Sequence, residues 1–274
     1  MQRSLLGILA LAAMLLAGTG AAFAEPQPWE WGFQPAASPI AEDIHWFYDW
    51  VLLPMMVIIS VFVAVLMAWI LVRFRKGRNP TPTRTTHNTL LEVVWTGLPI
   101  LILIGIAVPS LRLLYYEATI PEAAMTLKVT GHQWYWSYEY PDQGGINFDA
   151  IMVDEADLQD GQPRLLTTDN AIVLPVGEIV RVQVTSTDVI HSWAMPVAGV
   201  KTDAIPGRLN ELWIELDEPG MYYGQCSELC GVLHGFMPIM IQAVTPAEFE
   251  TWVGQQQAAM GITSTVDVAS AAQN

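Results

Sequence analysis

Two long stretches without a charged side chain constrain the fold of this chain most. Val51 to Val72 spans 22 residues and Val93 to Leu111 spans 19. An α-helix needs about 20 apolar residues to cross the hydrocarbon core of a membrane. A buried helix of a soluble protein is the alternative for either run taken alone. Two such runs around a basic connection favour a transmembrane hairpin, and Pro99 and Pro109 predict kinks in its second helix.

The connection between the two runs is strongly basic. The segment Arg73–Leu91 contains no acid and five bases, which are Arg73, Arg75, Lys76, Arg78 and Arg84. Lys and Arg accumulate in cytoplasmic loops, so this segment is expected in the cytoplasm and both chain ends outside. Two helices are too few to form a channel, and we expect them to pack against a larger partner.

The N-terminal segment has the pattern of an export signal. Arg3 precedes an apolar run, and Ala22-Phe23-Ala24 has the small-x-small form of a cleavage site. We therefore expect a signal peptide over Met1–Ala24, with an uncleaved anchor as the alternative. An irregular arm should follow, and Ile40–Trp50 should form a short helix at the membrane surface. This arrangement predicts a two-pass protein of a bacterial inner membrane with a periplasmic domain.

The negative charge lies almost entirely in the C-terminal part. The whole chain has a net charge of −15, and from Glu117 onward 21 acids face only 5 bases. Such a surface repels nucleic acid and anionic lipid, and it would attract a basic protein by long-range steering. Simple solubility is the competing explanation for the same charge.

Alternating apolar and polar residues predict an all-β domain over 117–260. The clearest strands are expected at Thr126–Thr130, Val180–Val184, Leu212–Leu216 and Ile239–Ile241. Pro- and Gly-rich turns separate them, which is typical of a β-sandwich or barrel. Thr245 and Glu248 have the spacing of a capping box, so a helix should run from Pro246 to about Met260. The tail Gly261–Asn274 is small and polar, and we expect it to be disordered.

Both cysteines of the chain lie in one short segment, Gly224–Met237. Cys226, Cys230, His234 and Met237 follow the spacing C-x3-C-x3-H-x2-M, and His191 lies upstream. Thiolate, imidazole and thioether donors suit copper far better than magnesium or calcium. A disulfide is the alternative for two cysteines in an exported protein. It would close a very small loop with little gain in chain entropy, and it would leave the His and Met spacing unexplained.

The segment Gly224–Met237 resembles the binuclear CuA loop of subunit II of haem–copper cytochrome c oxidase, and the resemblance extends from about Ile44 to Trp252. It implies a cupredoxin-like Greek-key domain with this loop between the last two strands. It also implies that Cys226 and Cys230 bridge two copper ions and that His191 and His234 each bind one of them. The remaining, weak ligands would be Met237 and the backbone carbonyl of Glu228.

The same resemblance assigns roles to residues around the loop. The Glu228 carboxylate would bind magnesium or manganese at the contact with subunit I, and Arg208 would pair there with haem propionates or acids. Trp134, which we expect in one strand with Trp136 and Tyr138 on the same face, would receive the electron from cytochrome c. The expected acidic ring for a basic cytochrome c comprises Glu139, Asp142, Asp149 and Asp188.

Glu92 has two competing interpretations. Thr89 and Glu92 fit a capping box at the start of the second helix, which would be a purely structural role. In the oxidase family that the chain resembles, a glutamate at the position of Glu92 lies at the entrance of a proton path into subunit I. Solvent-facing carboxylates exchange protons readily, so both roles stay open.

These features together predict an electron-accepting subunit of a respiratory oxidase. Electrons from cytochrome c would pass on to haem in subunit I, where oxygen is reduced and protons are pumped, and subunit III would complete the assembly. The main alternative is a membrane-tethered copper electron carrier that works alone. A copper chaperone or store and a domain with a structural disulfide are the others, and the presence of metal ligands disfavours a quinol oxidase subunit.

Overall fold

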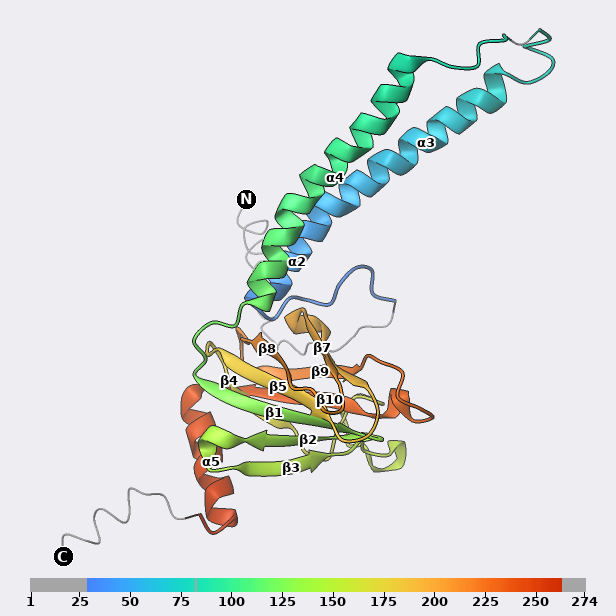
Figure 1. Ribbon diagram of the computed structural model, residues 1–274. Helices are drawn as coiled ribbons and strands as arrows, with labels where there is room; N and C mark the ends of the chain where they lie inside the picture. Colours follow the sequence, from blue (N-terminus) through green and yellow to red (C-terminus); the bar gives the residue numbers. More distant parts are fainter. Residues whose placement is uncertain (1–28, 82, 263–274) are drawn as a thin grey trace, which may run out of the picture. The chain divides into compact units, whose positions relative to one another are not determined.

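The computed structural model describes residues 29–81 and 83–262 (Figure 1). The chain divides into two compact units. One unit joins the residues up to Ala41 with those from Ile120 onward, and the other is Glu42–Thr119. The expected signal peptide lies outside the described residues, as does the expected tail beyond Ile262.

An apolar helical hairpin forms the bulk of the second unit. Helix α2 (Pro39–Phe47) continues through a π-helical turn (Tyr48–Leu52) into α3 (Leu53–Arg73), and α4 (Thr89–Ala118) follows the connection. No residue of α3 or α4 is buried, although both helices are apolar on all sides. The 21 residues of α3 extend about 31 Å, which matches the hydrocarbon core of a membrane.

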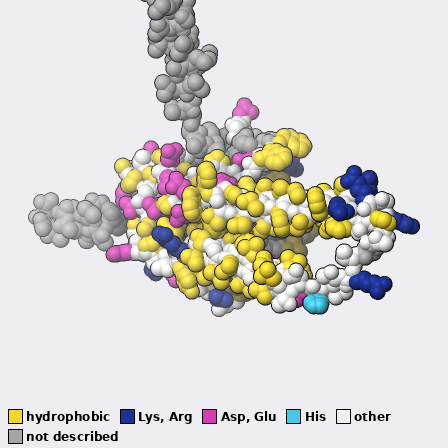
Figure 2. Space-filling view, turned by 90° about the horizontal axis from the view of Figure 1, so that it is seen from above, with side chains coloured by type: hydrophobic (Ala, Val, Ile, Leu, Met, Phe, Trp, Pro, Cys, Tyr) yellow, Lys and Arg dark blue, Asp and Glu magenta, His cyan; other side chains and the backbone are white. Residues whose placement is uncertain are grey.

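The surface of the hairpin separates apolar from basic side chains. Hydrophobic side chains cover the paired helices, and Lys and Arg gather at the end where the connection lies (Figure 2). Pro99 and Pro109 both lie inside α4, and the helix continues past them.

Two local expectations for the hairpin need refinement or correction. The short helix expected over Ile40–Trp50 is present as α2 and the π-helical turn, but it has no break after it and runs directly into α3. The N-cap of α4 is Asn88 and not Thr89. The Asn88 side chain accepts a hydrogen bond from the Leu91 N–H at 3.0 Å, while its own N–H lies 3.4 Å from Glu92 Oε1. Asn caps at least as well as Thr, and Asn88 has the extended backbone that is typical of an N-cap residue.

The other unit is a sandwich of two five-stranded sheets, which confirms the predicted fold class. The strand order of one sheet is β3-β2-β1-β5-β8 and that of the other is β4-β10-β9-β6-β7. The strands are β1 (Met125–His132), β2 (Tyr135–Tyr140), β3 (Ile146–Ala150), β4 (Ile172–Pro175), β5 (Val180–Ser186), β6 (His191–Met195), β7 (Val200–Ala204), β8 (Asn210–Ile214), β9 (Gly220–Cys226) and β10 (Pro238–Val244).

The core lies between the sheets and follows the alternation of the sequence. Every second residue of β1 and β5 is buried, and the parallel register of these strands pairs Leu127 with Val182. Helix α5 (Pro246–Ala259) covers the sandwich with Phe249 and Val253, and the predicted capping box of Thr245 and Glu248 is present at its start.

The chain before α2 is attached to the same sandwich. The Ala37 N–H donates to the Val197 carbonyl at 2.8 Å, and the Ala37 carbonyl accepts from the Asp217 N–H. The buried Ser38 hydroxyl donates to the Ala198 carbonyl at 2.8 Å. These bonds fix the arm at the end of the sandwich where Pro196–Gly199 turns.

Candidate metal centre

The candidate metal centre lies where β6 begins and β9 ends. His191 is the first residue of β6 and Cys226 the last of β9, and these antiparallel neighbours pair Trp193 with Cys226. A loop connects the end of β9 to the start of β10 at Pro238. It is attached to β6 at its first residue, where the Ser227 N–H donates to the Ser192 carbonyl at 2.9 Å. The loop therefore lies between the last two strands, where the sequence predicted it.

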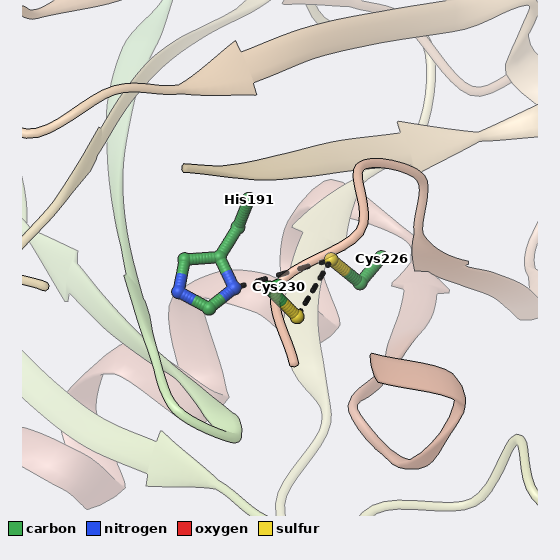
Figure 3. Close-up of side chains that lie close together, drawn as sticks. All are labelled: His191, Cys226 and Cys230. Carbon is green, nitrogen blue, oxygen red and sulfur yellow. Dashed lines mark hydrogen bonds between the residues drawn. The ribbon is translucent and has the colours of Figure 1, made fainter. Parts of the chain in front are cut away.

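The predicted donor atoms meet around the two sulfur atoms, and Figure 3 shows three of the side chains, those of His191, Cys226 and Cys230. Cys226 Sγ and Cys230 Sγ lie 3.8 Å apart, and His191 Nδ1 lies 4.0 Å from Cys226 Sγ. On the other side, His234 Nδ1 is 3.6 Å and Met237 Sδ 3.5 Å from Cys230 Sγ. The Glu228 carbonyl oxygen lies 3.4 Å from Cys226 Sγ. All six predicted ligand groups thus face one small volume.

These distances suit a metal ion better than a disulfide. Both cysteines are free, and their sulfurs are nearly twice the S–S bond length of about 2.05 Å apart. A zinc–thiolate bond is about 2.3 Å long, so at a separation of 3.8 Å one ion of similar size can contact both sulfurs at once. The donors are soft, and His191, Cys226 and Cys230 are buried, which is the chemistry that selects copper.

The two thiols ionise very differently. Burial opposes ionisation of Cys226, but the His191 ring and the Glu228 and Ser192 backbones outweigh it and lower the pKa of Cys226 to about 6. Burial and the neighbouring Cys226 thiolate raise the pKa of Cys230. The pair thus loses one proton easily and keeps the second, so a cation that replaces this proton would relieve the repulsion between two thiolates.

An acidic residue behind His191 fixes its ring. Asp188 Oδ1 lies 2.9 Å from His191 Nε2, which leaves Nδ1 directed at Cys226. Burial opposes ionisation of Asp188, but hydrogen bonds from His191 and from the Val189 and Gln133 backbones lower its pKa to about 2. Asp188 was expected only in the acidic ring. The Asp-x-x-His spacing was the available signal for this second contact.

A second ring supports the site from the core. Trp136 stands edge-on to His191, with the ring centroids 5.8 Å apart, and its Nε1 donates to the Met237 carbonyl at 3.2 Å. Trp136 is fully buried, so it fixes both a candidate ligand and the end of the loop.

Trp134 does not lie in a strand, contrary to our expectation. β1 ends at His132 and β2 starts at Tyr135, so Gln133 and Trp134 form the turn between them. Trp136 and Tyr138 do share the buried face of β2. Trp134 is half-buried, and its Nε1 donates to the Cys230 carbonyl at 3.2 Å, so its ring lies against the loop that contains both cysteines.

The remaining candidate residues are more exposed. The Glu228 side chain is exposed. In the proposed acidic ring, Glu139 pairs with Lys128 at 2.9 Å and Asp142 accepts the Thr126 N–H at 2.7 Å. Asp149 accepts from the Ser137 hydroxyl. Arg208 and Glu92 are both exposed.

The fold and the site define a class: a β-sandwich protein with two apolar helices and a buried His–Cys–Cys centre suited to copper. The model of the cytochrome c oxidase subunit II periplasmic domain matches residues 125–244, and that of the subunit II transmembrane domain matches residues 26–113. The chain belongs to the cytochrome c oxidase subunit II family. It is therefore a membrane protein, and its β-sandwich corresponds to the periplasmic domain of that family.

Several relatives are similar over nearly the whole chain. A probable cytochrome c oxidase subunit 2 of Rickettsia bellii is 47% identical, over 91% of this chain and 92% of that protein. Cytochrome c oxidase subunit 2 of Cereibacter sphaeroides is 44% identical, over 92% and 91%. The crystal structure of the periplasmic domain of cytochrome oxidase subunit II of Bradyrhizobium japonicum is 55% identical, covers 52% of this chain and 99% of that one, and gives a TM-score of 0.48. The chain is accordingly a subunit of a haem–copper oxidase, an oxidoreductase.

Proposed function

We propose that the chain is the subunit through which electrons from cytochrome c enter the oxidase. The observation that carries this proposal is the meeting of two thiols, two imidazoles, one thioether and one carbonyl within a few ångströms. In this proposal two copper ions would be held by the thiolates of Cys226 and Cys230 and by the rings of His191 and His234, with Met237 and the Glu228 carbonyl as weak ligands. When bound, such a copper pair supplies a one-electron redox couple.

The protein's own part is to hold the ligands and to bind the donor. Strands β6 and β9 pair Trp193 with Cys226 and so hold the ends of both strands, with His191 and Cys226, close together; the Asp188 and Trp136 contacts orient the His191 ring. Ligands held in this way need little movement when the charge of the centre changes. Trp134 is the proposed first electron acceptor, because its half-buried ring bonds directly to the carbonyl of Cys230.

The ligand assignment is tested by spin resonance and metal analysis of the purified oxidase. We expect one unpaired electron shared equally by two copper nuclei. Cys226→Ser should abolish this signal, because a hydroxyl is a poor bridge between soft ions. Ser227→Ala is the matched control in the same loop, and it should retain the signal. A signal confined to one copper nucleus, or a native Cys226–Cys230 disulfide, would refute the assignment.

The docking of cytochrome c is proposed to use the acidic surface of the sandwich. Asp142 and Asp149 are exposed, whereas Glu139 is partly neutralised by Lys128. Exposed charges act mainly on association rates and are screened by salt. Asp142→Asn should therefore slow association and flatten its dependence on ionic strength. Glu178→Gln, a change of the same charge outside the proposed ring, should do neither.

The remaining proposals rest on the resemblance to the family. Glu228, which is exposed in the single chain, would bind magnesium or manganese together with subunit I, and Arg208 would face the same subunit. Subunit III would complete the assembly. The protein would span a bacterial inner membrane with both ends of the mature chain in the periplasm and the basic connection in the cytoplasm. Metal analysis of the Glu228→Gln variant of the assembled oxidase tests the second metal site. This variant should lose manganese, because an amide replaces the carboxylate, and should keep copper.

Glu92 is proposed to admit protons to subunit I. Its Oε1 also accepts a weak bond from the Asn88 N–H, at 3.4 Å, so removal of the side chain would disturb the helix start. Glu92→Gln keeps an acceptor at that place and removes only the ionisable group. Slower oxygen reduction or proton pumping in this variant would support the proton role, and unchanged rates would leave Glu92 as a cap only.

A further inference from the structure

The turn between β1 and β2 contacts the candidate copper centre on two sides, at Asp188, which bonds to His191, and at Cys230. The backbone N–H of Gln133 donates to Asp188 Oδ2 at 2.7 Å. Its side-chain amide reaches the opposite way and donates to the Cys230 carbonyl at 2.8 Å, where Trp134 Nε1 also donates at 3.2 Å. One residue therefore joins the carboxylate behind His191 to the backbone of Cys230.

Asp188 is held on several sides, which makes it a rigid connection. Besides the Gln133 N–H, it accepts the Val189 N–H at 2.6 Å and faces the Ser186 hydroxyl at 3.2 Å. Its contact with His191 Nε2 at 2.9 Å completes the set. A carboxylate bound by so many donors has one orientation, so the position of Gln133 and the orientation of the His191 ring are linked.

The turn is also packed tightly onto the loop of the copper ligands. Gly231 follows Cys230 and has a φ of +125°, and a Cβ there would lie 2.9 Å from Trp134 Cζ2 and 3.2 Å from Gln133 Nε2. A side chain at position 231 would therefore push the Trp134 ring and the Gln133 amide away. The close contact indicates that the turn and the loop are fitted to each other.

We propose that Gln133 and Asp188 are positioning residues for electron input: they hold the Trp134 ring and the His191 ring in one fixed arrangement around Cys230. This inference rests on the proposed function and deepens it. It also gives Asp188 a role that differs from that of an exposed docking acid. Residues that orient metal ligands and reacting groups typically change affinity or rate by about 10- to 100-fold when they are removed.

The test uses the assembled oxidase and a pre-bound, photoreduced cytochrome c at low ionic strength. Gln133→Met keeps the length of the side chain and removes the amide that bonds to Cys230. We expect the rate of electron arrival at copper to fall about tenfold, with KM for cytochrome c within twofold and the copper content intact. Asp188→Asn should in addition shift the copper absorption spectrum and the histidine hyperfine couplings, because the partner of His191 Nε2 changes.

Asn147→Leu is the matched control, because it also removes an exposed amide that donates to a backbone carbonyl, that of Gly145 at 2.9 Å. It should leave the transfer rate unchanged. A full rate in Gln133→Met would overturn the inference, as would a rise in KM alone or a loss of copper, since these indicate docking or folding roles. Trp134→Ala tests the electron route separately from the positioning role of Gln133 and Asp188. If this variant transfers electrons at the normal rate, the proposed route through Trp134 is wrong.

Discussion

Replacement of Gly224 by alanine should separate the two strands that carry the proposed ligands His191 and Cys226. Gly224 lies in β9, and a Cβ there would be 2.1 Å from the backbone oxygen of Ala194 in β6. Real Cβ atoms stay at least 3.0 Å from such an atom, so the strands must move apart by about 0.9 Å. Because β6 begins with His191 and β9 ends with Cys226, this movement separates these two donors.

The size of the effect follows from the contacts that are lost. Overpacking of a core typically costs about 1–3 kcal/mol. The short β6–β9 pairing joins only Trp193 with Cys226 and Ala194 with Gln225. Loss of one of its hydrogen bonds adds about 1 kcal/mol. A total of about 2–4 kcal/mol corresponds to a fall in melting temperature of about 5–15 °C for a domain of this size.

The assay is thermal unfolding of the purified oxidase, followed by the visible absorption of its copper, together with metal analysis. We expect Gly224→Ala to melt early and to bind less copper. Gly235→Ala is the control in the same loop, because a Cβ there meets nothing within 4 Å. If Gly224→Ala melts within 2 °C of the control and keeps its copper, as a rough criterion, the inferred tight approach of β6 and β9 is wrong.

Three further outcomes test the sandwich itself. Burial raises the pKa of Tyr138 and Tyr140, so both stay neutral in the folded protein. The free energy of unfolding should therefore not depend on these two groups below about pH 10, the pKa of a free tyrosine, and should fall above it. In an alkaline absorbance titration, both should stay un-ionised until the protein unfolds. Leu127→Ala should cost about 2–5 kcal/mol in thermal unfolding, because this side chain is fully buried. Thr245→Ala should cost about 1 kcal/mol through loss of the α5 cap, and Thr251→Ala, inside the same helix, should cost less.

Local patterns predicted the parts whose physics is local. The length of a charge-free run decides whether it can span a membrane, and this length can be counted along the chain. Val51–Val72 and Val93–Leu111 therefore predicted α3 and most of α4. The two-residue period of Val180, Val182 and Val184 predicted a half-buried strand, since successive strand side chains point to opposite faces. The spacing from Cys226 to Met237 predicted that one loop would present these donors together.

Competing local signals explain where sequence reasoning failed. Asn88 and Thr89 are both good caps, and only the backbone conformation decided between them. The aromatic run around Trp134 suits a strand, but β1 and β2 pair through His132 and Tyr135, so Gln133 and Trp134 between them form a turn. The exposure of Glu228 depends on how the whole loop is oriented, which no local pattern specifies.

The sequence by itself determined the membrane hairpin, the strand pattern and the soft donors of the loop, because each depends on residues close together in the chain. Residue spacing alone did not place His191 next to Cys226, which only the family resemblance implied, and only the tertiary structure decided that Gln133 joins Asp188 to Cys230. These contacts link residues 35 to 97 positions apart. They exist because the order of strands in the two sheets, and not the order along the chain, sets which backbone segments are neighbours.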